Sequence, residues 1–129
     1  MIHGIGIDIV DVKRIDDIIG RWGETFLRRV YSREEIDYCA GMARASMHFA
    51  ARFAAKEAFL KCIGVELRKG ISLRHISVDN KRDGSPVLRF QEEFADRLFQ
   101  HGITKTYVSL SHTDTYATAV VILEEKQKR

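Results

Sequence analysis

Cysteine is scarce in this sequence, with only Cys39 and Cys62 among 129 residues. Neither has a partner at a metal-ligand spacing and no histidine cluster accompanies them, so a zinc site is disfavoured. A chain of this length buries most of its apolar surface without disulfides. We therefore expect both thiols to be free in a reducing compartment.

Long hydrophobic runs are absent as well. No segment reaches the ~18 consecutive apolar residues that a membrane-spanning helix needs. Met1 is followed at once by an alternating pattern, instead of the charged region and apolar run of a secretory signal. These absences predict a soluble, cytoplasmic protein without a membrane partner.

Neither sign of charge dominates the composition. The 21 lysines and arginines nearly balance the 18 aspartates and glutamates, and the net charge is +3 at pH 7. This balance does not indicate nucleic acid as a partner, and it suits an anionic ligand or an acidic protein at least as well. Hydrophobic residues make up 45% of the chain, so we expect one ordered domain over residues 1–129.

Periodicity divides the chain into helices first and hairpins later. Alternation over residues 2–12 predicts a strand with Ile5, Ile7 and Ile9 on one face. Ser32 followed by Glu35 is a capping-box pattern that begins a helix. The further expected elements are helices over 13–20, 32–41, 46–63 and 92–101, a short turn over 26–31, strands over 74–79, 86–90, 107–112 and 116–123, and a frayed tail over 124–129. This order predicts an α+β fold in which an antiparallel sheet packs against a long buried helix.

The longest expected helix is apolar nearly all round, which is typical of a buried helix. His48, Arg52 and Lys56 lie four residues apart and can form its solvent face. Glu57 and Lys61 form a second stripe ~100° further round, among phenylalanines and alanines, where an unpaired carboxylate is unfavourable. Two interpretations remain open: a surface ion pair between Glu57 and Lys61, or a carboxylate that binds a metal ion.

Asp8 raises the same question, because it lies in a strand-like run of isoleucines where aspartate is disfavoured. Gly4 and Gly6 precede it on the same face and leave room for another group to approach the backbone. Either the strand lies at a sheet edge and Asp8 faces water, or Asp8 has a functional partner. Asp8 and Glu57 together suit Mg²⁺, which binds one or two protein carboxylates and leaves positions for water and substrate phosphate. Such a site serves phosphoryl transfer.

Two further patterns stay open at this stage. Ser109, Ser111 and His112 end a strand, and a Ser–His hydrolase is the alternative to simple sheet packing, although no nucleophile-elbow sequence surrounds either serine. The N-terminal third is rich in arginine, which indicates a mixed solvated face. If Trp22 or Phe26 is exposed beside those arginines, a protein-docking patch is favoured instead.

Three segments resemble the holo-acyl-carrier-protein synthases, the small 4′-phosphopantetheinyl transferases. They are Gly-Ile-Gly-Ile-Asp-Ile-Val over 4–10 followed by Arg14, Phe-Ala-Ala-Arg-Phe-Ala-Ala-Lys-Glu-Ala over 49–58 followed by Lys61 and Gly64, and Ser-Leu-Ser-His over 109–112 followed by Tyr116. Their order and separation fit this family over essentially the whole chain. The resemblance implies the 4′-phosphopantetheinyl transferase fold. It also implies transfer of 4′-phosphopantetheine from coenzyme A to a serine of apo acyl carrier protein, with release of adenosine 3′,5′-bisphosphate, in support of fatty acid biosynthesis.

The resemblance also implies roles for particular residues. Asp8 and Glu57 resemble the Mg²⁺ ligands, and Lys61 resembles the lysine beside the transferring phosphate. Glu57, directly or through a metal-bound water, resembles the base that takes the serine proton. The residues implied to contact the adenosine and 3′-phosphate of coenzyme A are Arg52, Gly84, Ser85, Pro86, Ser111 and His112. The residues implied to form the carrier-docking surface are Arg14, Ile18, Arg21, Phe26 and Arg29.

Similar proteins form homotrimers whose active sites lie between two subunits, so part of the nucleotide pocket is expected from a neighbouring copy. The sequence departs from the family pattern at residues 65–69, where glycine and threonine are usual, and before the long helix, where Arg44 is the only basic residue apart from His48. Two other function classes remain: a non-catalytic module that binds coenzyme A or a nucleotide, and a basic domain that only docks carrier proteins. The presence of both carboxylates argues against them.

Overall fold

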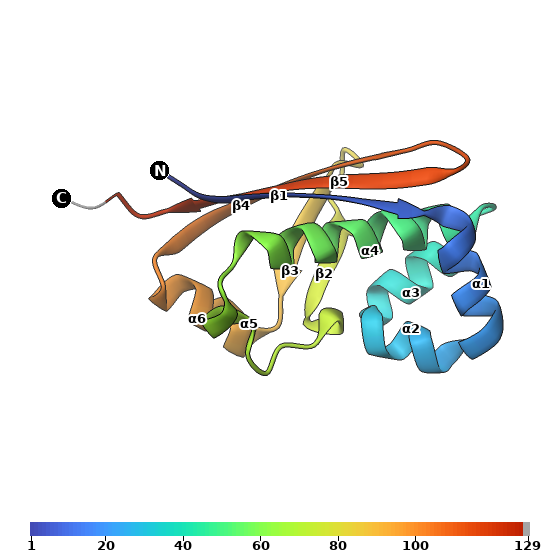
Figure 1. The fold of residues 1–129 in the computed structure, drawn as a ribbon, viewed down its shortest axis with the longest axis horizontal. Helices are drawn as coiled ribbons and strands as arrows, with labels where there is room; N and C mark the ends of the chain where they lie inside the picture. The colour runs from blue at the N-terminus through green and yellow to red at the C-terminus, as the bar shows by residue number, and fades with distance from the viewer. Residues whose placement is uncertain (128–129) are drawn as a thin grey trace.

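A long helix lies along one face of a three-stranded antiparallel sheet in the computed structural model, which describes residues 1–127 (Figure 1). The strands β1 (Ile2–Asp11), β5 (Tyr116–Glu125) and β4 (Ile103–His112) pair in the order β1-β5-β4, so β1 is an edge strand. The helix α4 (Ala45–Cys62) packs over β1 and β5. The expected α+β fold is confirmed.

Two glycines of β1 explain how closely α4 approaches the sheet. A Cβ atom at Gly6 would lie 1.9 Å from the carbonyl oxygen of Ala58, and one at Gly4 would lie 2.5 Å from that of Cys62. No larger residue fits at either position unless α4 moves away. The sequence indicated that these glycines make room for another group, and that group is the backbone of α4.

Three short helices follow β1 and pack near the first half of α4. Asp11 caps the first of them by accepting a hydrogen bond from the Lys13 N–H at 3.0 Å, and the capping box predicted at Ser32 is present. Gly23, with a φ of 53°, separates the first two helices. The second helix spans residues 24–30, where the sequence indicated only a short turn. The three are α1 (Val12–Trp22), α2 (Glu24–Val30) and α3 (Arg33–Ala40).

A two-stranded sheet and several short elements complete the fold. The paired strands are joined by a tight turn over residues 81–84. The helical segments over residues 65–68 and 73–75 were not expected, because segments of three or four residues show no periodicity. The strand predicted to begin at residue 74 therefore begins at residue 76. The elements are β2 (Ile76–Asn80), β3 (Pro86–Phe90), α5 (Val65–Arg68), the 3₁₀ helix η1 (Leu73–His75) and α6 (Glu92–Gln100).

The C-terminal segment is more ordered than the sequence indicated. Glu124 and Glu125 belong to β5, and the Glu125 N–H donates to the Met1 carbonyl at 2.7 Å. The prediction of a frayed tail is therefore wrong for these two residues, since pairing with β1 and β4 fixes them. Residues 128–129 of that tail lie outside the described residues.

The stripe of His48, Arg52 and Lys56 is not the solvent face of α4 that the sequence suggested. Arg52 is 3% exposed and Lys56 is fully buried, whereas His48 is partly exposed. The reason is that α3 and β2 pack against this side of α4. Helical periodicity locates a polar stripe, but it does not show whether another element covers it.

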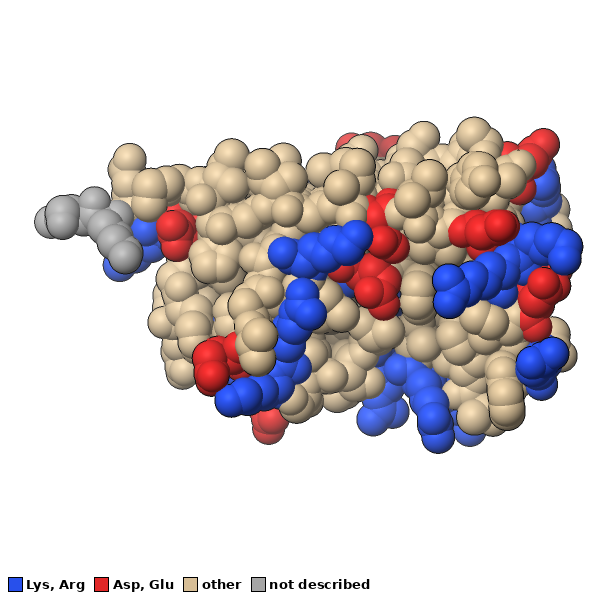
Figure 2. All heavy atoms as spheres, viewed as in Figure 1, with Lys and Arg blue, Asp and Glu red and all other residues tan. Residues whose placement is uncertain are grey.

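The outer face of the three-stranded sheet, opposite α4, is apolar over β1 and the adjoining part of β5, whereas β4 presents Ser109 and Ser111 there. Ile5, Ile7 and Ile9 of β1 are 62%, 61% and 66% exposed. Ile122 and Val120 of β5 lie directly opposite Ile5 and Ile7 and share this face. Over the helical part of the molecule, basic and acidic side chains are interspersed instead (Figure 2). No helix within residues 1–127 is long and apolar enough to cross a membrane.

Candidate functional site

Asp8 and Lys61, which the sequence placed in one site, are in contact. Lys61 Nζ donates to Asp8 Oδ1 at 3.0 Å and to the Ile7 carbonyl at 2.8 Å. The Asp8 side chain is 19% exposed and faces α4, even though β1 is an edge strand. Within residues 1–127, Lys61 thus pairs with Asp8 and forms no surface ion pair with Glu57.

Glu57 lies half-buried beside this pair. Burial raises the pKa of the Glu57 carboxyl above its ordinary value of 4.5, and the negative charge of Asp8 raises it further. The positive charges of Lys61 and Arg68 act in the opposite direction. Two carboxylates are therefore held close enough to repel each other. A bound cation or a proton relieves such repulsion, so the pair is a candidate cation site.

A cleft of about 570 Å³ opens where β1, α1 and α4 meet, and the two carboxylates lie on its wall. Arg14 and Ile18 of α1 line this cleft, and they also line the depression that runs along α1. The cleft therefore connects the carboxylate pair to the exposed surface of α1. Its remaining walls are Ile9, Val10, Asp11, Ile15, Phe53 and Tyr116.

The ligands available in the cleft suit Mg²⁺. Asp8 and Glu57 supply carboxylate oxygens from two separate elements, and the open cleft leaves room for water and phosphate to complete an octahedral shell. Within residues 1–127, no group of three or more histidine, cysteine or acidic side chains is arranged to hold a metal ion. A hard cation that is bound jointly by the protein and a phosphate-bearing substrate is the chemistry that this pair supports.

The residues implied to contact the nucleotide form a second group. Arg52 Nη2 donates to Asn80 Oδ1 at 2.7 Å, and Asn80 Nδ2 donates to the Gly84 carbonyl at 2.9 Å. Gly84 has a φ of 87° and closes the turn over residues 81–84, in which its N–H donates to the Lys81 carbonyl at 2.9 Å; Ser85 then leads into Pro86, the first residue of β3. The structure thus links Arg52 to the turn at residues 84–86 through Asn80, a residue that sequence reasoning did not assign.

Ser111 and His112 lie at exposed positions where β4 ends. The ring centroid of His112 is 6.2 Å from that of His48, which is 6.0 Å from that of Tyr38. The Arg52 guanidinium in turn lies 4.5 Å from the Tyr38 ring centroid. His112 therefore belongs to the Arg52 group. Since no Ser–His hydrogen bond forms at this strand end in residues 1–127, the hydrolase alternative gains no support.

Within one chain, the residues implied to contact the nucleotide are separate from the pair of carboxylates. None of Arg52, Ser111 and His112 lines the cleft that holds Asp8 and Glu57. Asp8 lies on β1 at one edge of the sheet, whereas Ser111 lies on β4 at the other edge. Each chain therefore presents two separate groups of candidate site residues.

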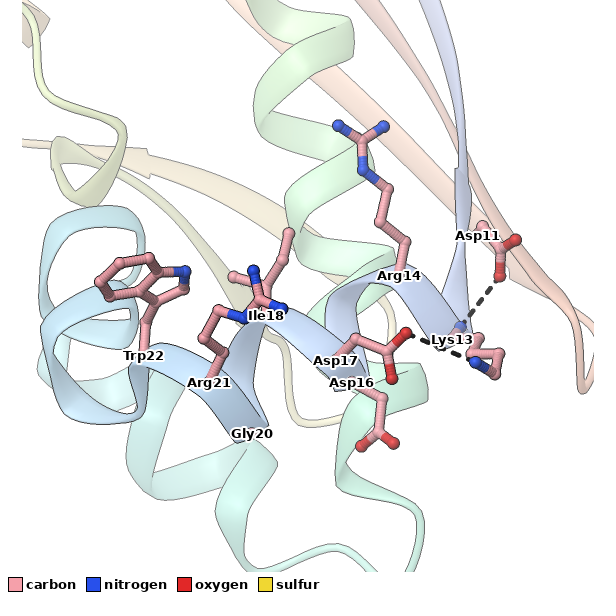
Figure 3. A pocket seen from close by; sticks show the side chains of 9 residues that line it. All are labelled: Asp11, Lys13, Arg14, Asp16, Asp17, Ile18, Gly20, Arg21 and Trp22. Atoms are coloured by element: carbon pink, nitrogen blue, oxygen red, sulfur yellow. Dashed lines mark hydrogen bonds and ion pairs between the residues drawn. The ribbon is translucent and has the colours of Figure 1, made fainter.

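The exposed surface of α1 carries the residues implied to dock a carrier protein. Arg14, Ile18 and Arg21 follow one another along the helix, beside a depression of about 800 Å³ (Figure 3). Trp22, next to Arg21, is 60% exposed. The sequence favoured a docking patch on the condition that an aromatic residue is exposed beside the arginines, and Trp22 meets this condition.

The two docking residues expected on α2 differ from each other. Arg29 is exposed, whereas Phe26 is partly buried and its ring centroid lies 6.0 Å from that of Tyr31. Phe26 therefore packs α2 against the core as well as reaching the surface. The structure brings Arg14 and Ile18 to the carboxylate cleft, but not Phe26 or Arg29.

Three residues around the carboxylate pair were given no role from the sequence, although two of them belong to the matching segments. Phe53 lies one turn before Glu57 on α4, so helical spacing alone could have identified it. Tyr116 directly follows the β4–β5 turn and lines the cleft. Arg68 influences the pKa of Glu57 from α5, and no sequence signal marks it, because it lies in the segment that departs from the family pattern.

Comparison with known proteins agrees with this geometry. The family model of the 4′-phosphopantetheinyl transferase superfamily matches residues 4–121. The chain is 48% identical to a holo-[acyl-carrier-protein] synthase of Syntrophus aciditrophicus, over 96% of this chain and 97% of that protein. The crystal structure of holo-[acyl-carrier-protein] synthase from Neisseria meningitidis has a TM-score of 0.89 at 33% identity, covering 97% of this chain and 100% of that one.

A third similar protein was crystallised with a ligand. The Helicobacter pylori holo-[acyl-carrier-protein] synthase in complex with coenzyme A has a TM-score of 0.77 at 32% identity, covering 93% of this chain and 99% of that one. The matching fold, the near-complete coverage and the paired carboxylates lead to one conclusion. This chain belongs to the holo-[acyl-carrier-protein] synthase family of the 4′-phosphopantetheinyl transferase superfamily.

Proposed function

We propose that this chain transfers 4′-phosphopantetheine from coenzyme A to a serine of an apo acyl carrier protein, with Mg²⁺ bound by Asp8 and Glu57. The observation that carries the proposal is the cleft in which these carboxylates adjoin Arg14 and Ile18 of α1. A carrier docked on α1 is thereby brought beside the carboxylate pair. Family membership supplies the reaction class, since relatives are named for this activity.

The charged groups of the cleft suit a phosphoryl-type transfer. Negative charge spreads over the phosphate in the transition state, and Mg²⁺, when bound, neutralises that charge. Lys61, held 3.0 Å from Asp8, adds a second positive charge at the same place. Glu57 accepts a proton more readily than an ordinary carboxylate, because its pKa is raised, so we assign it as the base for the serine hydroxyl.

We assign the nucleotide end of coenzyme A to Arg52, the turn at 84–86, Ser111 and His112. Because this group lies apart from Asp8 and Glu57 within one chain, a complete site requires the nucleotide group of one copy beside the carboxylates of another. The exposed isoleucines of β1 support such an assembly, and we propose a homotrimer closed through the outer face of the sheet.

The decisive test is mass spectrometry of an apo acyl carrier protein after incubation with this chain, coenzyme A and Mg²⁺. We expect the carrier to gain one phosphopantetheine and adenosine 3′,5′-bisphosphate to be released. Asp8→Ala and Glu57→Ala should each abolish the gain while leaving the chain folded, because each removes one of two repelling carboxylates. Chelation should stop the wild type reversibly.

The outcomes also separate the alternatives. Coenzyme A binding without any mass gain on several apo carriers would indicate a non-catalytic binding module instead of a transferase. Near-normal turnover of Glu57→Ala would show that Glu57 is not a metal ligand. The single-domain organisation of residues 1–129 and the cytoplasmic location stay predictions.

A further inference from the structure

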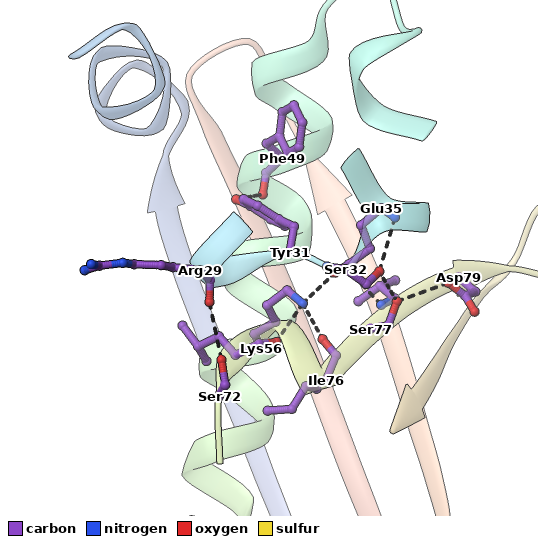
Figure 4. A network of polar contacts seen from close by, with 12 residues as sticks. Arg29, Tyr31, Ser32, Glu35, Phe49, Lys56, Ser72, Ile76, Ser77 and Asp79 are labelled. Atoms are coloured by element: carbon purple, nitrogen blue, oxygen red, sulfur yellow. Dashed lines mark hydrogen bonds and ion pairs between the residues drawn. The ribbon is translucent and has the colours of Figure 1, made fainter. Parts of the chain in front are cut away.

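Lys56 is fully buried, yet all of its hydrogen-bonding capacity is used. Its Nζ donates to Glu35 Oε1 at 2.7 Å, to the Leu73 carbonyl at 3.0 Å and to the Ile76 carbonyl (Figure 4). An ammonium group has three donors, so this set saturates it. The bonds join α4 to α3, to η1 and to the start of β2.

Glu35 is equally enclosed, and both of its carboxylate oxygens accept hydrogen bonds. Its side chain has no exposed surface, and besides Lys56 it accepts from the Ser32 N–H at 2.9 Å and from the Val78 N–H at 3.0 Å. Removing one member would leave the other buried without its partner, which is strongly destabilising. Replacing both members by neutral groups of similar shape is often harmless to stability. Stability alone therefore does not account for the pair.

The other buried residues of α4 near Lys56 make apolar contacts. Ala54, Ala55 and Ala58 are small, and Phe59 packs against the rings of Phe90 and Phe94. The close approach of Ala58 to Gly6 sets the distance between α4 and the sheet. Over residues 53–60, Lys56 is the buried side chain that makes hydrogen bonds to other elements, and hydrogen bonds are directional.

Glu57 immediately follows Lys56, and the two side chains diverge by ~100° around the helix. The direction of Lys56 therefore fixes the direction of Glu57 toward the cleft and, one turn later, of Lys61 toward Asp8. We propose that Lys56 and Glu35 are positioning residues, which hold α4 in the rotation that presents Glu57 and Lys61 to Asp8. This inference rests on the proposed function, because the positioned groups are the proposed Mg²⁺ site.

The test compares two variants that perturb the same region. Lys56→Met with Glu35→Gln keeps shape and removes the ion pair, but the single amide oxygen of glutamine can accept from only one of the Ser32 and Val78 N–H groups, which donate to different oxygens of Glu35. Val78→Ala truncates a core side chain of β2 that is 1% exposed and leaves the ion pair intact. Both full-length variants are measured by thermal unfolding, by calorimetric titration with Mg²⁺, and by NMR contacts between Ala58 and Gly6.

We expect the double variant to bind Mg²⁺ about tenfold more weakly, the size of effect usual for residues that orient metal ligands. Its Ala58–Gly6 contacts should also weaken. Val78→Ala should melt at least as far below the wild type as the double variant, with Mg²⁺ affinity and contacts unchanged. The proposal would be overturned if the double variant kept its Mg²⁺ affinity and its Ala58–Gly6 contacts. It would also be overturned if Val78→Ala lost as much Mg²⁺ affinity and as many of these contacts as the double variant. If the wild type itself binds no Mg²⁺, the metal assignment fails, and the Ala58–Gly6 contacts alone then decide the positioning role.

Discussion

At the scale of single residues, the cleft places function and stability in conflict. Glu57 is partly buried next to Asp8, and both conditions make its ionised form unfavourable in the folded chain. The proposed roles of Glu57, to bind Mg²⁺ and to accept a proton, require that ionised form. The negative charge of ionised Glu57 should therefore lower the free energy of unfolding at the pH at which the enzyme is active.

This conflict predicts how Glu57→Gln alters stability with pH. A raised carboxyl pKa contributes stability that is present below the ordinary value of 4.5 and is lost as pH rises through the raised value. In buffer without divalent cations, the variant should therefore melt above the wild type at pH 7.5, and the difference should vanish near pH 4. Asp96→Asn on the exposed side of α6 serves as control and should show no such gain. A variant that melts below the wild type at pH 7.5 would contradict the argument.

At the scale of elements, the contact between β1 and α4 positions the site, since Asp8 lies on the strand and Glu57 on the helix. The contact depends on the absence of two side chains, at Gly4 and Gly6. A methyl group at either position meets backbone, which cannot rotate away as a side chain can. The sequence motif that resembles the family therefore has a packing role as well as a functional one.

Gly6→Ala should accordingly be costly, because its Cβ would lie 1.9 Å from the Ala58 carbonyl oxygen. We expect a loss of at least ~1–3 kcal/mol in the free energy of unfolding, the usual cost of forcing an extra carbon into a packed core. Chemical denaturation at fixed protein concentration measures it. Gly20→Ala in α1 is the matched control: a Cβ there meets nothing within 4 Å, so it should gain ~0.5–1 kcal/mol. Equal stability of the two variants would refute this account of the strand–helix contact.

At the scale of the whole molecule, assembly decides whether the two groups of candidate site residues meet. The outer sheet face exposes Ile5, Ile7 and Ile9 side by side with apolar residues of β5. A contiguous apolar face of this kind marks an interaction surface. Burying it between copies would remove apolar surface from water, and the proposed shared site requires that the Arg52 group of one copy then lies beside the Asp8–Glu57 cleft of another.

Ile7→Lys tests this assembly. We expect the wild type to sediment as three chains of 14.8 kDa and the variant as one, with loss of turnover because each site then lacks its neighbour's residues. Sedimentation equilibrium and the mass-spectrometric assay measure the two effects. Phe99→Lys replaces a residue of α6 that is 72% exposed away from the sheet face, and it should alter neither. A monomeric but active wild type would exclude the shared site.

The carrier surface on α1 also belongs to this scale, because it concerns a second protein. Arg21 is a cleaner probe than Arg14, which also lines the carboxylate cleft. Arg21→Glu should raise the KM for the carrier by about tenfold, or ~1.4 kcal/mol, since it reverses one charge facing an acidic partner. The KM for coenzyme A should stay the same, and added salt should weaken the wild type more than the variant.

Steady-state kinetics with each substrate varied separately distinguishes these effects. Arg33→Glu, a reversal of an exposed charge on α3, is the control and should leave the carrier KM within about twofold of the wild type, as charge changes outside an interface contribute little. If Arg21→Glu raises the KM for coenzyme A instead, the docking face lies elsewhere.

Local patterns were sufficient for much of the fold. Alternation gave β1, the capping box gave the start of α3, and the apolar stretch gave α4 nearly to its ends. These features depend on neighbours in the sequence, so periodicity and capping rules reach them. The short segments α5 and η1 have no periodicity and were not found. The pairing of Glu124 and Glu125 depends on strands far along the chain, so the predicted fraying was wrong.

The candidate site also has features that follow from local sequence and features that depend on tertiary packing. The sequence by itself determined which residues are candidates for the chemistry, because an aspartate among isoleucines and a glutamate on an apolar helix are unfavourable without a partner. Only the tertiary structure decided that Lys61 pairs with Asp8 and that Arg14 lines the carboxylate cleft. It alone also decided that Lys56 is buried against Glu35 instead of facing water. The physical reason is that the periodicity of a helix or strand fixes the face on which a residue lies. The partner of that residue depends on which other element of the fold packs against that face.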